Sequence, residues 1–320
     1  MTDRTDGTGR EAVPWHEGER AVQRRLGVAE SAEGRARFIR DFMPDQHRIF
    51  FAQLPFAVLG TLDRSGDPWA TILGGPPGFL SSPDPRTLHI GAVPEEDDPT
   101  AESIAVGKRV ALLGIELPTR RRNRMNGQIV DLDLSGFTVV VEQSFGNCPQ
   151  YIQRRDYGPR RPPHYPSAEP LSPGDGWALD LMRKADTLFV ASSTVPGRSG
   201  TGAGIDVSHR GGRPGFVAIA DDGAIEVPDY RGNRFFNTLG NIAAYPRAGL
   251  LFVDFETGDL LQLTGAAEIV WDGPQVSALP DAERLWRVTP SRMVRLRGGF
   301  PLQFGEPEFS PLLLARPVPA

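Results

Sequence analysis

The sequence predicts a mainly β protein with flanking helices (α+β), built as two tandem β-barrels related by internal duplication. Three observations support this prediction. Short runs rich in β-branched and aromatic residues recur along the chain, and Gly-, Asp- and Pro-rich turns separate them. The same order of runs occurs once in each half of the chain. The 36 glycines and 30 prolines also favour turns over long helices.

Length and charge exclude several classes of protein. The 320 residues are enough for two domains. The 35 Lys and Arg against 40 Asp and Glu give a net charge of −5, whereas a nucleic-acid-binding protein typically carries a basic excess. The sequence has no apolar run long enough for a membrane span and no apolar signal segment at its N-terminus. We therefore expect a cytoplasmic protein that binds neither nucleic acid nor membrane.

The first half is predicted to hold an N-terminal helical extension over residues 1–44 and a first barrel over residues 45–145. In the extension, apolar residues recur at helical spacing. In the barrel, the pattern changes to that of short strands with polar turns between them. The six strands expected there cover residues 56–62, 69–75, 87–90, 109–117, 124–133 and 137–143.

The second half is predicted to repeat this pattern. A Pro- and Arg-rich linker over residues 146–176 leads to a second barrel over residues 177–275, and residues 276–320 form a C-terminal extension. The helices expected in this barrel cover residues 177–185 and 233–244, and its strands cover 187–193, 205–210, 216–220, 224–228, 247–255 and 260–270. The clearest match between the halves pairs residues 108–117 (KRVALLGIEL) with residues 246–255 (PRAGLLFVDF).

The first candidate binding site lies at the predicted strand-to-helix turn of residues 228–241. Arg231 and Arg234 flank the expected start of a helix at Asn233, a good N-cap residue. Free backbone N–H groups, the positive end of the helix dipole and two guanidinium groups together favour the binding of a phosphate. A capped helix with two solvated arginines would give the same pattern.

The second candidate site is the predicted strand that contains residues 206–210. Asp206, Ser208 and Arg210 share one face of this strand, and His209 lies on the other face. His209 is either a general base or a structural histidine. The sequence has no Ser/His/Asp motif and no zinc-binding motif, so we predict no metal site and assign no catalytic residue.

Cys148 is the only cysteine of the chain and cannot form an internal disulfide. A redox or nucleophilic role would need nearby positive charge, which Arg154 and Arg155 could supply. The alternative is that Cys148 is a small buried side chain of the core.

Several motifs occur in a fixed order along the chain. They are WHEGERAVQ at residues 15–23, GNCPQYIQ at 146–153, DYRGNR at 229–234, PRAGLLFV at 246–253 and LQLTGAAE at 261–268. In this order the chain resembles the pyridoxamine 5′-phosphate oxidase-related family of FMN-binding split barrels. The first two motifs are similar to those of its longer, duplicated members. The resemblance extends from about residue 14 to residue 275 and is more specific for a fold than for a reaction.

The resemblance implies two tandem split β-barrels with FMN at the seam between them. It implies that the FMN phosphate is bound near the strand-to-helix turn, that one strand lines the flavin, and that a second strand reaches the ring or the ribityl chain. The residues at the corresponding positions are Arg231, Asn233, Arg234 and Asn237 for the phosphate, Ser208, His209 and Arg210 on the lining strand, and Gln262 on the second strand.

The first barrel departs from this pattern. Residues 93–98 (VPEEDD) stand where the second barrel has its arginine motif, and their four carboxylates would repel a phosphate. We therefore expect the first barrel to have lost its site. The Lys and Ser that vitamin B6 oxidases commonly use at the turn are also absent, which argues against that particular activity.

The expected function is that of an FMN-dependent oxidoreductase of the pyridoxamine 5′-phosphate oxidase-like type. Its flavin would transfer hydride or electrons to or from a small-molecule substrate. The alternatives are a protein that binds haem, with His209 as axial ligand, or a deazaflavin, or a non-catalytic flavin-binding or interaction protein. A duplicated barrel could also form a homodimer.

Overall fold

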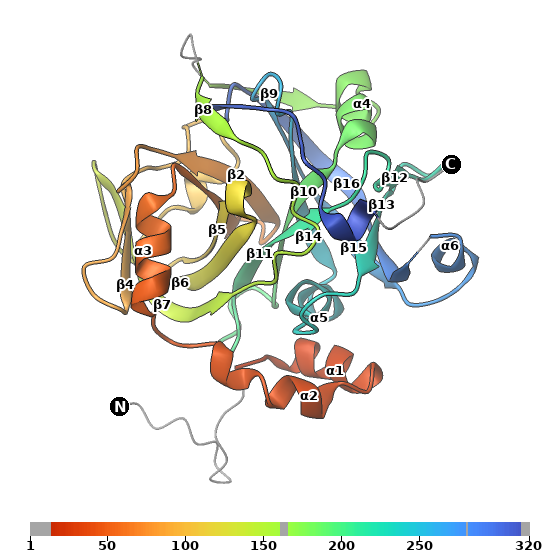
Figure 1. Ribbon diagram of the computed structural model, residues 1–320, viewed down its shortest axis with the longest axis horizontal. Coiled ribbons are helices and arrows are strands. Elements are labelled where there is room, and N and C mark those ends of the chain that lie inside the picture. The colour runs from red at the N-terminus through yellow and green to blue at the C-terminus, as the bar shows by residue number, and fades with distance from the viewer. Residues whose placement is uncertain (1–13, 161–165, 280, 315–320) are drawn as a thin grey trace.

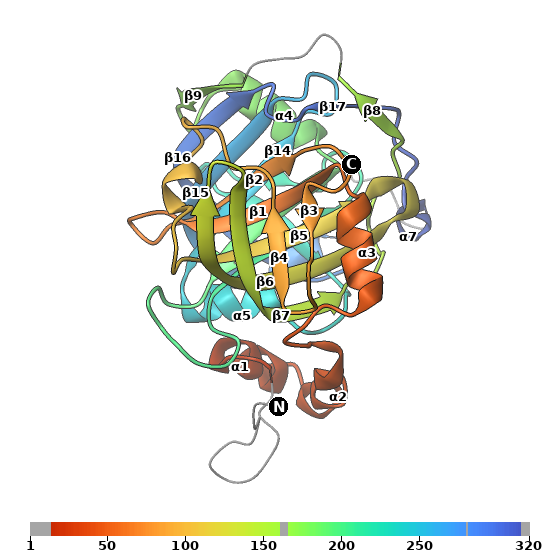
Figure 2. The same ribbon diagram turned by 90° about the vertical axis from the view of Figure 1, so that its left-hand side faces the viewer.

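Two β-sheets form the body of the molecule (Figure 1), as a computed structural model shows. The structure describes residues 14–160, 166–279 and 281–314. The first sheet has the strand order β2-β1-β5-β6-β7-β4-β3. Its strands are β1 (Phe56–Leu62), β2 (Pro68–Gly74), β3 (Leu80–Ser81), β4 (Thr87–Ile90), β5 (Arg109–Glu116), β6 (Arg121–Asp133) and β7 (Gly136–Gly146). Figure 2 views the molecule from the side of this sheet.

The second sheet has the order β11-β10-β14-β15-β16-β13-β12, and β9 pairs with β16. Its strands are β9 (Ser167–Leu171), β10 (Thr187–Ser193), β11 (Ile205–Gly211), β12 (Ala218–Ile219), β13 (Ile225–Tyr230), β14 (Arg247–Val253), β15 (Leu260–Val270) and β16 (Ala282–Arg297). Apart from β9, its strands follow one another in the same order as those of the first sheet. This agreement concerns strand order, and the internal duplication stays a prediction.

Short helices flank the sheets. They are α1 (Glu17–Arg25), α2 (Ala29–Glu33), α3 (Asp45–Gln53), α4 (Gly176–Lys184), α5 (Asn237–Ala244), α6 (Pro274–Ser277) and α7 (Pro311–Leu314), with 3-10 turns η1 (Ala36–Phe38), η2 (Ala101–Ser103) and η3 (Leu117–Thr119). The predicted mainly β composition with flanking helices is confirmed. None of the described helices is long and apolar enough to cross a membrane.

The structure extends the second barrel beyond its predicted end at residue 275. Strand β16 pairs with both β15 and β13, so residues 282–297 belong to the second sheet and not to a C-terminal extension. The predicted linker also contains strands: β9 joins the second sheet, and β8 (Tyr157–Pro159) pairs with β17 (Leu302–Phe304). Residues 1–13 and 315–320 of the two predicted extensions lie outside the described residues.

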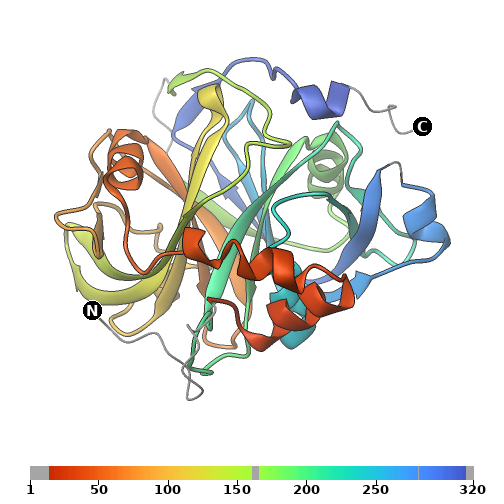
Figure 3. The ribbon, with the colours of Figure 1, turned by 60° about the horizontal axis from the view of Figure 1, so that its bottom comes forward.

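The seam between the two barrels is an apolar interface. Strands β1, β2 and β5 of the first barrel contact β10, β11 and β14 of the second. One buried cluster contains side chains from both, among them Val58, Leu113, Val207 and Leu251. Figure 3 shows the barrels side by side, with the N-terminal helices drawn in red across the front. Helix α1 packs on α5 of the second barrel.

Gly249 marks the closest approach between the barrels. A Cβ atom at this position of β14 would lie 2.2 Å from the carbonyl oxygen of Pro68 on β2. Because the obstacle is backbone, it cannot rotate away, and the two sheets must separate to admit a methyl group. The seam therefore depends on a residue without a side chain at this point.

We predict that Gly249→Ala lowers the free energy of unfolding by about 2–4 kcal/mol, because the added methyl group overpacks the seam. Urea unfolding followed by tryptophan fluorescence measures the change. Gly174→Ala is the control, since a Cβ there meets nothing within 4 Å. A Gly249→Ala variant as stable as this control would contradict the close approach.

Candidate functional site

A pocket opens at the seam, between the start of β6, the segment after β7, strand β11 and the start of α5. Its cavity volume is about 100 Å³, and the whole hollow, including space open to solvent, measures about 910 Å³. Both barrels contribute to it. Its polar lining includes Arg122, Arg124 and Asn147 from the first barrel and its following segment, and Ser208, His209, Arg210, Asn233, Arg234 and Asn237 from the second barrel.

Two arginines in this pocket have no carboxylate partner. Arg210 Nη1 donates to the carbonyl oxygen of His209 at 3.1 Å, and Arg122 Nη1 approaches the same oxygen at 3.5 Å. Neither forms an ion pair with a carboxylate in the part of the chain that the structure describes. The nearby buried carboxylates of Asp206 and Asp229 pair with other arginines. Two positive charges are thus held around one carbonyl oxygen.

The pKa values reflect this uncompensated charge. Burial and the charges of Arg210 and Arg124 lower the pKa of Arg122 to about 9. Burial also lowers the pKa of Arg210, while the charge of Asp229, which is itself paired with Arg284, acts to raise it. For His209, burial and the two neighbouring guanidiniums of Arg122 and Arg210 lower the pKa well below its usual range, so its ring is neutral near pH 7. An anion bound here would relieve the repulsion between the arginines.

His209 is buried and its two ring nitrogens have no hydrogen-bond partner among the described residues. The Nε of Arg210 also lacks one. Buried polar atoms are normally paired, so these unpaired nitrogens in residues at the pocket wall are unusual.

A buried network fixes the wall of the pocket. Arg124 on β6 pairs with Asp206 on β11 at 2.8 Å and also donates to the hydroxyl of Ser208. Asp206 accepts further hydrogen bonds from Asn126 Nδ2 at 2.7 Å and from Asn241 Nδ2 at 3.3 Å. The network ties the first barrel to the second and to α5, so the residues beside it keep a fixed position.

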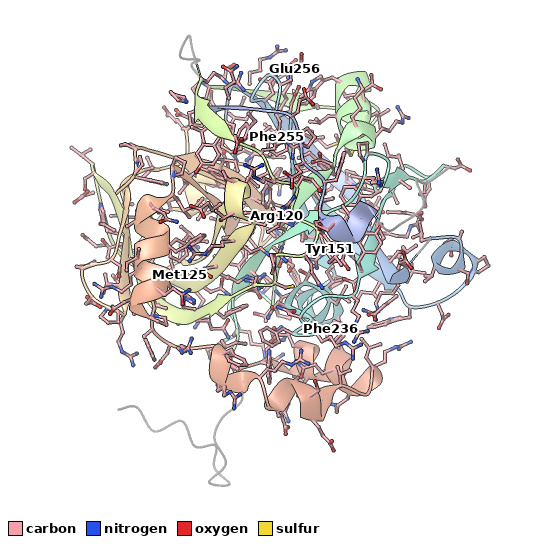
Figure 4. All side chains as sticks on the ribbon, in the orientation of Figure 1. Arg120, Met125, Tyr151, Phe236, Phe255 and Glu256 are labelled. Atoms are coloured by element: carbon pink, nitrogen blue, oxygen red, sulfur yellow. The ribbon has the colours of Figure 1, made fainter. Side chains whose placement is uncertain are left out.

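The pocket also has aromatic side chains. The rings of Tyr151 and Tyr230 lie 5.3 Å apart with an interplanar angle of 35°, and both line the pocket together with Phe236. Tyr151 donates its hydroxyl to the carbonyl oxygen of Arg231 at 3.0 Å. Figure 4 shows Tyr151 near the middle of the molecule and Phe236 below it, close to α5 and the N-terminal helices. Aromatic faces beside guanidiniums suit an aromatic ligand with an anionic group.

Backbone strain is concentrated at the same place. Five described residues other than glycine have positive φ, and three of them, Tyr151, Arg234 and Phe236, line the pocket. Such conformations are uncommon and cluster at binding and active sites, where the surrounding structure enforces them.

The strand-to-helix turn differs from the prediction. Helix α5 begins at Asn237 and not at Asn233, and its N-cap residue Phe236 has a φ of 62°. The Asn233 side chain accepts from the N–H of Phe235 at 3.0 Å and so stabilises a turn before the helix. Asn237 lines the pocket, but its amide donates to the buried carboxyl of Glu19 on α1. Burial and Asp206 raise the pKa of Glu19 well above its usual range.

The other predicted residues separate into two groups. Ser208, His209, Arg210 and Arg234 all line the pocket. Arg231 is exposed and does not line it. Gln262 does not line it either: its Nε2 donates to the carbonyl oxygen of Ala70 at 3.1 Å and to the carboxylate of Asp98.

Gln262 lies on the other side of the seam, at the position that is equivalent to Arg124 in the pocket. The sequence match of 108–117 with 246–255 pairs Leu113 with Leu251, and their strand partners are Arg124 and Gln262. The same argument makes Thr71 on β2 equivalent to Ser208 on β11. At this second position, Asp98 accepts hydrogen bonds from both Thr71 and Gln262. A carboxylate of the chain therefore satisfies the polar groups on this side, and the same register places apolar Leu260 and Leu73 where the pocket has Arg122 and Arg210.

Arg122, Arg124 and Tyr151 are absent from the predicted site residues. They lie on the first barrel and the segment after it, and the seam brings them to the second barrel. One signal in the sequence could have indicated two of them: Arg122, Arg124 and Asn126 alternate along one face of β6, whose predicted range was residues 124–133. Within the described ranges, no group of three or more potential ligands could hold a metal ion.

Residues 43–163 match the family described as pyridoxamine 5′-phosphate oxidase. The resemblance predicted from the motifs is thereby confirmed for this segment of the chain. The matched range includes Arg122, Arg124 and Tyr151 and ends before the second barrel. A comparison with curated proteins gives no match.

Three solved structures are similar to part of the chain. Group A Streptococcus HupZ is 17% identical, with a TM-score of 0.30, and the match covers 38% of this chain and 93% of that one. An FAD-binding protein from Mesorhizobium loti is 12% identical, with a TM-score of 0.28, covering 40% and 97%. The FAD-binding protein from Mycobacterium smegmatis is 15% identical, with a TM-score of 0.26, covering 40% and 98%.

We predict that Arg122→Met raises the free energy of unfolding of the ligand-free protein by about 1 kcal/mol at pH 7, because it removes a charge that the guanidiniums of Arg210 and Arg124 repel. The pKa of Arg122 is lowered in the folded state, so the cost of its charge is fully present below about pH 9. That cost falls as the pH rises through this value. The gain from Arg122→Met should therefore shrink between pH 8 and pH 10.

Urea unfolding at several pH values measures this effect. The control is Arg231→Met, which removes an exposed arginine outside the pocket and should change the stability by less than about 0.5 kcal/mol. A loss of stability in Arg122→Met at pH 7 would show that Arg122 is a structural residue and would refute the uncompensated charge.

Proposed function

We propose that the pocket at the seam binds FMN and that the protein is a flavin-dependent oxidoreductase for a small molecule. The observation that carries this proposal is the pair of guanidiniums of Arg122 and Arg210, which converge without a carboxylate partner in the described chain. The match of residues 43–163 to the family described as pyridoxamine 5′-phosphate oxidase adds to it. The FAD-binding proteins named above bind a flavin by their description.

The residues present fit the chemical parts of FMN. A phosphate would be bound by Arg122 and Arg210, with Arg234 at the same pocket, since guanidiniums form paired charge-assisted hydrogen bonds with phosphate oxygens. Tyr151 and Tyr230 offer aromatic faces in the wider hollow. The neutral ring of His209 has two free nitrogens for hydrogen bonds.

Bound FMN would supply hydride or electron transfer through its isoalloxazine ring. The residues of the chain would bind and orient it. The Arg124–Asp206 pair keeps the wall in place, and the two arginines hold the anionic end. No side chain of the pocket has to act as a nucleophile for such a reaction, so catalytic residues stay unassigned. A homodimer and a deazaflavin cofactor stay predictions.

Haem is a second candidate because of one observation. His209 is buried in the pocket with both ring nitrogens unpartnered in the described structure, and a neutral imidazole of this kind is what an axial ligand requires. The guanidiniums of Arg122 and Arg210 would then pair with the propionate groups of the haem. Flavin and haem differ strongly in absorption, so a spectrum separates the two proposals.

We predict that the purified protein, or the apoprotein after incubation with FMN, absorbs near about 375 and about 450 nm and binds about one FMN per chain. We expect a single site per chain because the carboxylate of Asp98 occupies the equivalent place on the other side of the seam, where it accepts a hydrogen bond from Gln262. Absorption spectroscopy and mass spectrometry of the heat-released ligand provide the measurement. An intense band near about 400 nm would favour haem. A colourless protein that takes up neither ligand would refute both proposals.

We predict that Arg122→Gln and Arg210→Gln each weaken FMN binding at least about tenfold, because each removes a charge-assisted hydrogen bond to the phosphate. Titration calorimetry of the apoproteins measures the affinity. Arg231→Gln is the matched control and should stay within about threefold of the wild type, since Arg231 is exposed outside the pocket. If Arg231→Gln loses FMN while Arg210→Gln retains it, the phosphate is bound at the turn instead.

A further inference from the structure

The strand-to-helix turn of residues 231–236 lies between the pocket and the N-terminal segment, by which we mean residues 14–39. Arg234 and Phe236 line the pocket, whereas Phe235 between them does not. Phe235 is 5% exposed and belongs to a buried cluster formed with the N-terminal segment and β7, whose other members are Trp15, Ala32, Ile39 and Phe145. Figure 1 shows α1 and α2 next to α5, where this turn leads into the helix.

The N-terminal segment also contacts the backbone of the turn at two carbonyl oxygens. Gln23 Nε2 on α1 donates to the carbonyl oxygen of Phe235 at 3.1 Å, and Gln23 is only 2% exposed. Arg35 Nη1 donates to the carbonyl oxygen of Asn233 at 2.8 Å. These two carbonyls lie on either side of Arg234 in the sequence. Neither Gln23 nor Arg35 lines the pocket, so both act on it only through the turn.

The contact continues from the turn into α5. A Cβ atom at Gly18 would lie 2.2 Å from the carbonyl oxygen of Gly240, and a Cβ atom at Gly240 would lie 2.5 Å from the Cα of Glu19. Two glycines therefore allow α1 to approach α5 at backbone distance. Asn237, the first residue of α5, donates its side-chain N–H to the carboxyl of Glu19. The N-terminal segment, the turn and the start of α5 thus form one packed unit.

The turn needs such support because of its backbone conformation. Arg234 has a φ of 60° and Phe236 a φ of 62°, in the left-handed region that residues with a side chain avoid. Such conformations persist where the surrounding structure enforces them. Hydrogen bonds to the carbonyls of Asn233 and Phe235 fix the peptide groups around Arg234. The N-terminal segment therefore supplies part of the enforcement.

We propose that Gln23 and Arg35 are positioning residues of the pocket: they hold the turn in the conformation that places Arg234 and Phe236 at the ligand. The proposal rests on the proposed function, since it takes FMN as the ligand. It also implies a reciprocal coupling. A segment that raises the affinity for a ligand is itself stabilised by that ligand to the same extent. Bound FMN should therefore stabilise the docked N-terminal segment.

Hydrogen–deuterium exchange of the ligand-free protein measures the turn directly. Gln23→Met keeps the size of the side chain and removes the donor, and it leaves the net charge unchanged, so its effect cannot arise from the charge of the pocket. Arg35→Met removes the second donor. We expect each variant to raise the exchange rate over residues 233–241 at least about threefold and to leave β4 unchanged. In the native protein, saturating FMN should slow exchange over α1.

Titration calorimetry with FMN measures the consequence for the ligand. Each variant should weaken FMN binding at least about fivefold, because only molecules with the ordered turn bind. Arg24→Met is the charge-matched control for Arg35→Met, since Arg24 is exposed and pairs with Glu17 on the same helix. Arg35→Lys keeps a charged donor and should recover part of the affinity. Ile90→Val trims the core of the first barrel and controls for a general loss of stability.

Two results would overturn the proposal. One is exchange at the native rate over residues 233–241 in both variants, which would show that the turn keeps its conformation without the N-terminal segment. The other is faster exchange in the turn together with an FMN affinity equal to that of Arg24→Met, which would show that binding does not depend on the turn. Failure of the proposed function gives a different result, because the native protein would then bind no FMN. Inorganic pyrophosphate, an anion without a ring, then takes the place of FMN in the same titrations.

Discussion

The buried ion pair between Arg124 and Asp206 is the interaction on which the site depends most. It crosses the seam from β6 to β11 at 2.8 Å, and both side chains are almost fully buried. Removal of one partner would leave an uncompensated buried charge, at a cost of about 3–5 kcal/mol. Asp206 also accepts from Asn126 and Asn241, so one carboxylate orients both barrels and α5. The position of the pocket wall follows from this pair.

The same pair explains why the pocket is cationic. Most buried arginines of the described chain have a carboxylate, as Arg284 has Asp229 and Arg155 has Asp186. Asp206 pairs with Arg124, whereas neither Arg122 nor Arg210 forms an ion pair within the described chain, although the charge of Asp229 acts on Arg210. Desolvating a cation costs free energy unless a counter-charge is present, so a fold that keeps two of them together has lost stability at that place. Such a loss of stability is typical of a binding site for an anionic ligand, because the bound anion supplies the missing counter-charge.

Much of the fold could be predicted from the sequence, because alternation of apolar residues and turn chemistry are local properties. Strand β16 was missed since its apolar residues are interrupted by arginines (RLWRVTPSRMVRLR) and its outer face is exposed. The start of α5 was misplaced since Asn233 caps a turn that contains two left-handed residues. The site was predicted in part: Ser208, His209 and Arg210 are local to one strand. Arg122 and Arg124 depend on contacts across the seam, which no local pattern contains.

A chain with two barrels can carry different residues at the two equivalent positions of the seam. A symmetric dimer of single barrels must build the same site twice, because each residue occurs at both equivalent positions. Here the equivalent positions differ: Ser208 and Arg124 on one side correspond to Thr71 and Gln262 on the other. Asp98 accepts hydrogen bonds from Thr71 and Gln262 and satisfies that side internally. One side can therefore contribute stability to the seam, while the other keeps the unpaired charges that a ligand requires.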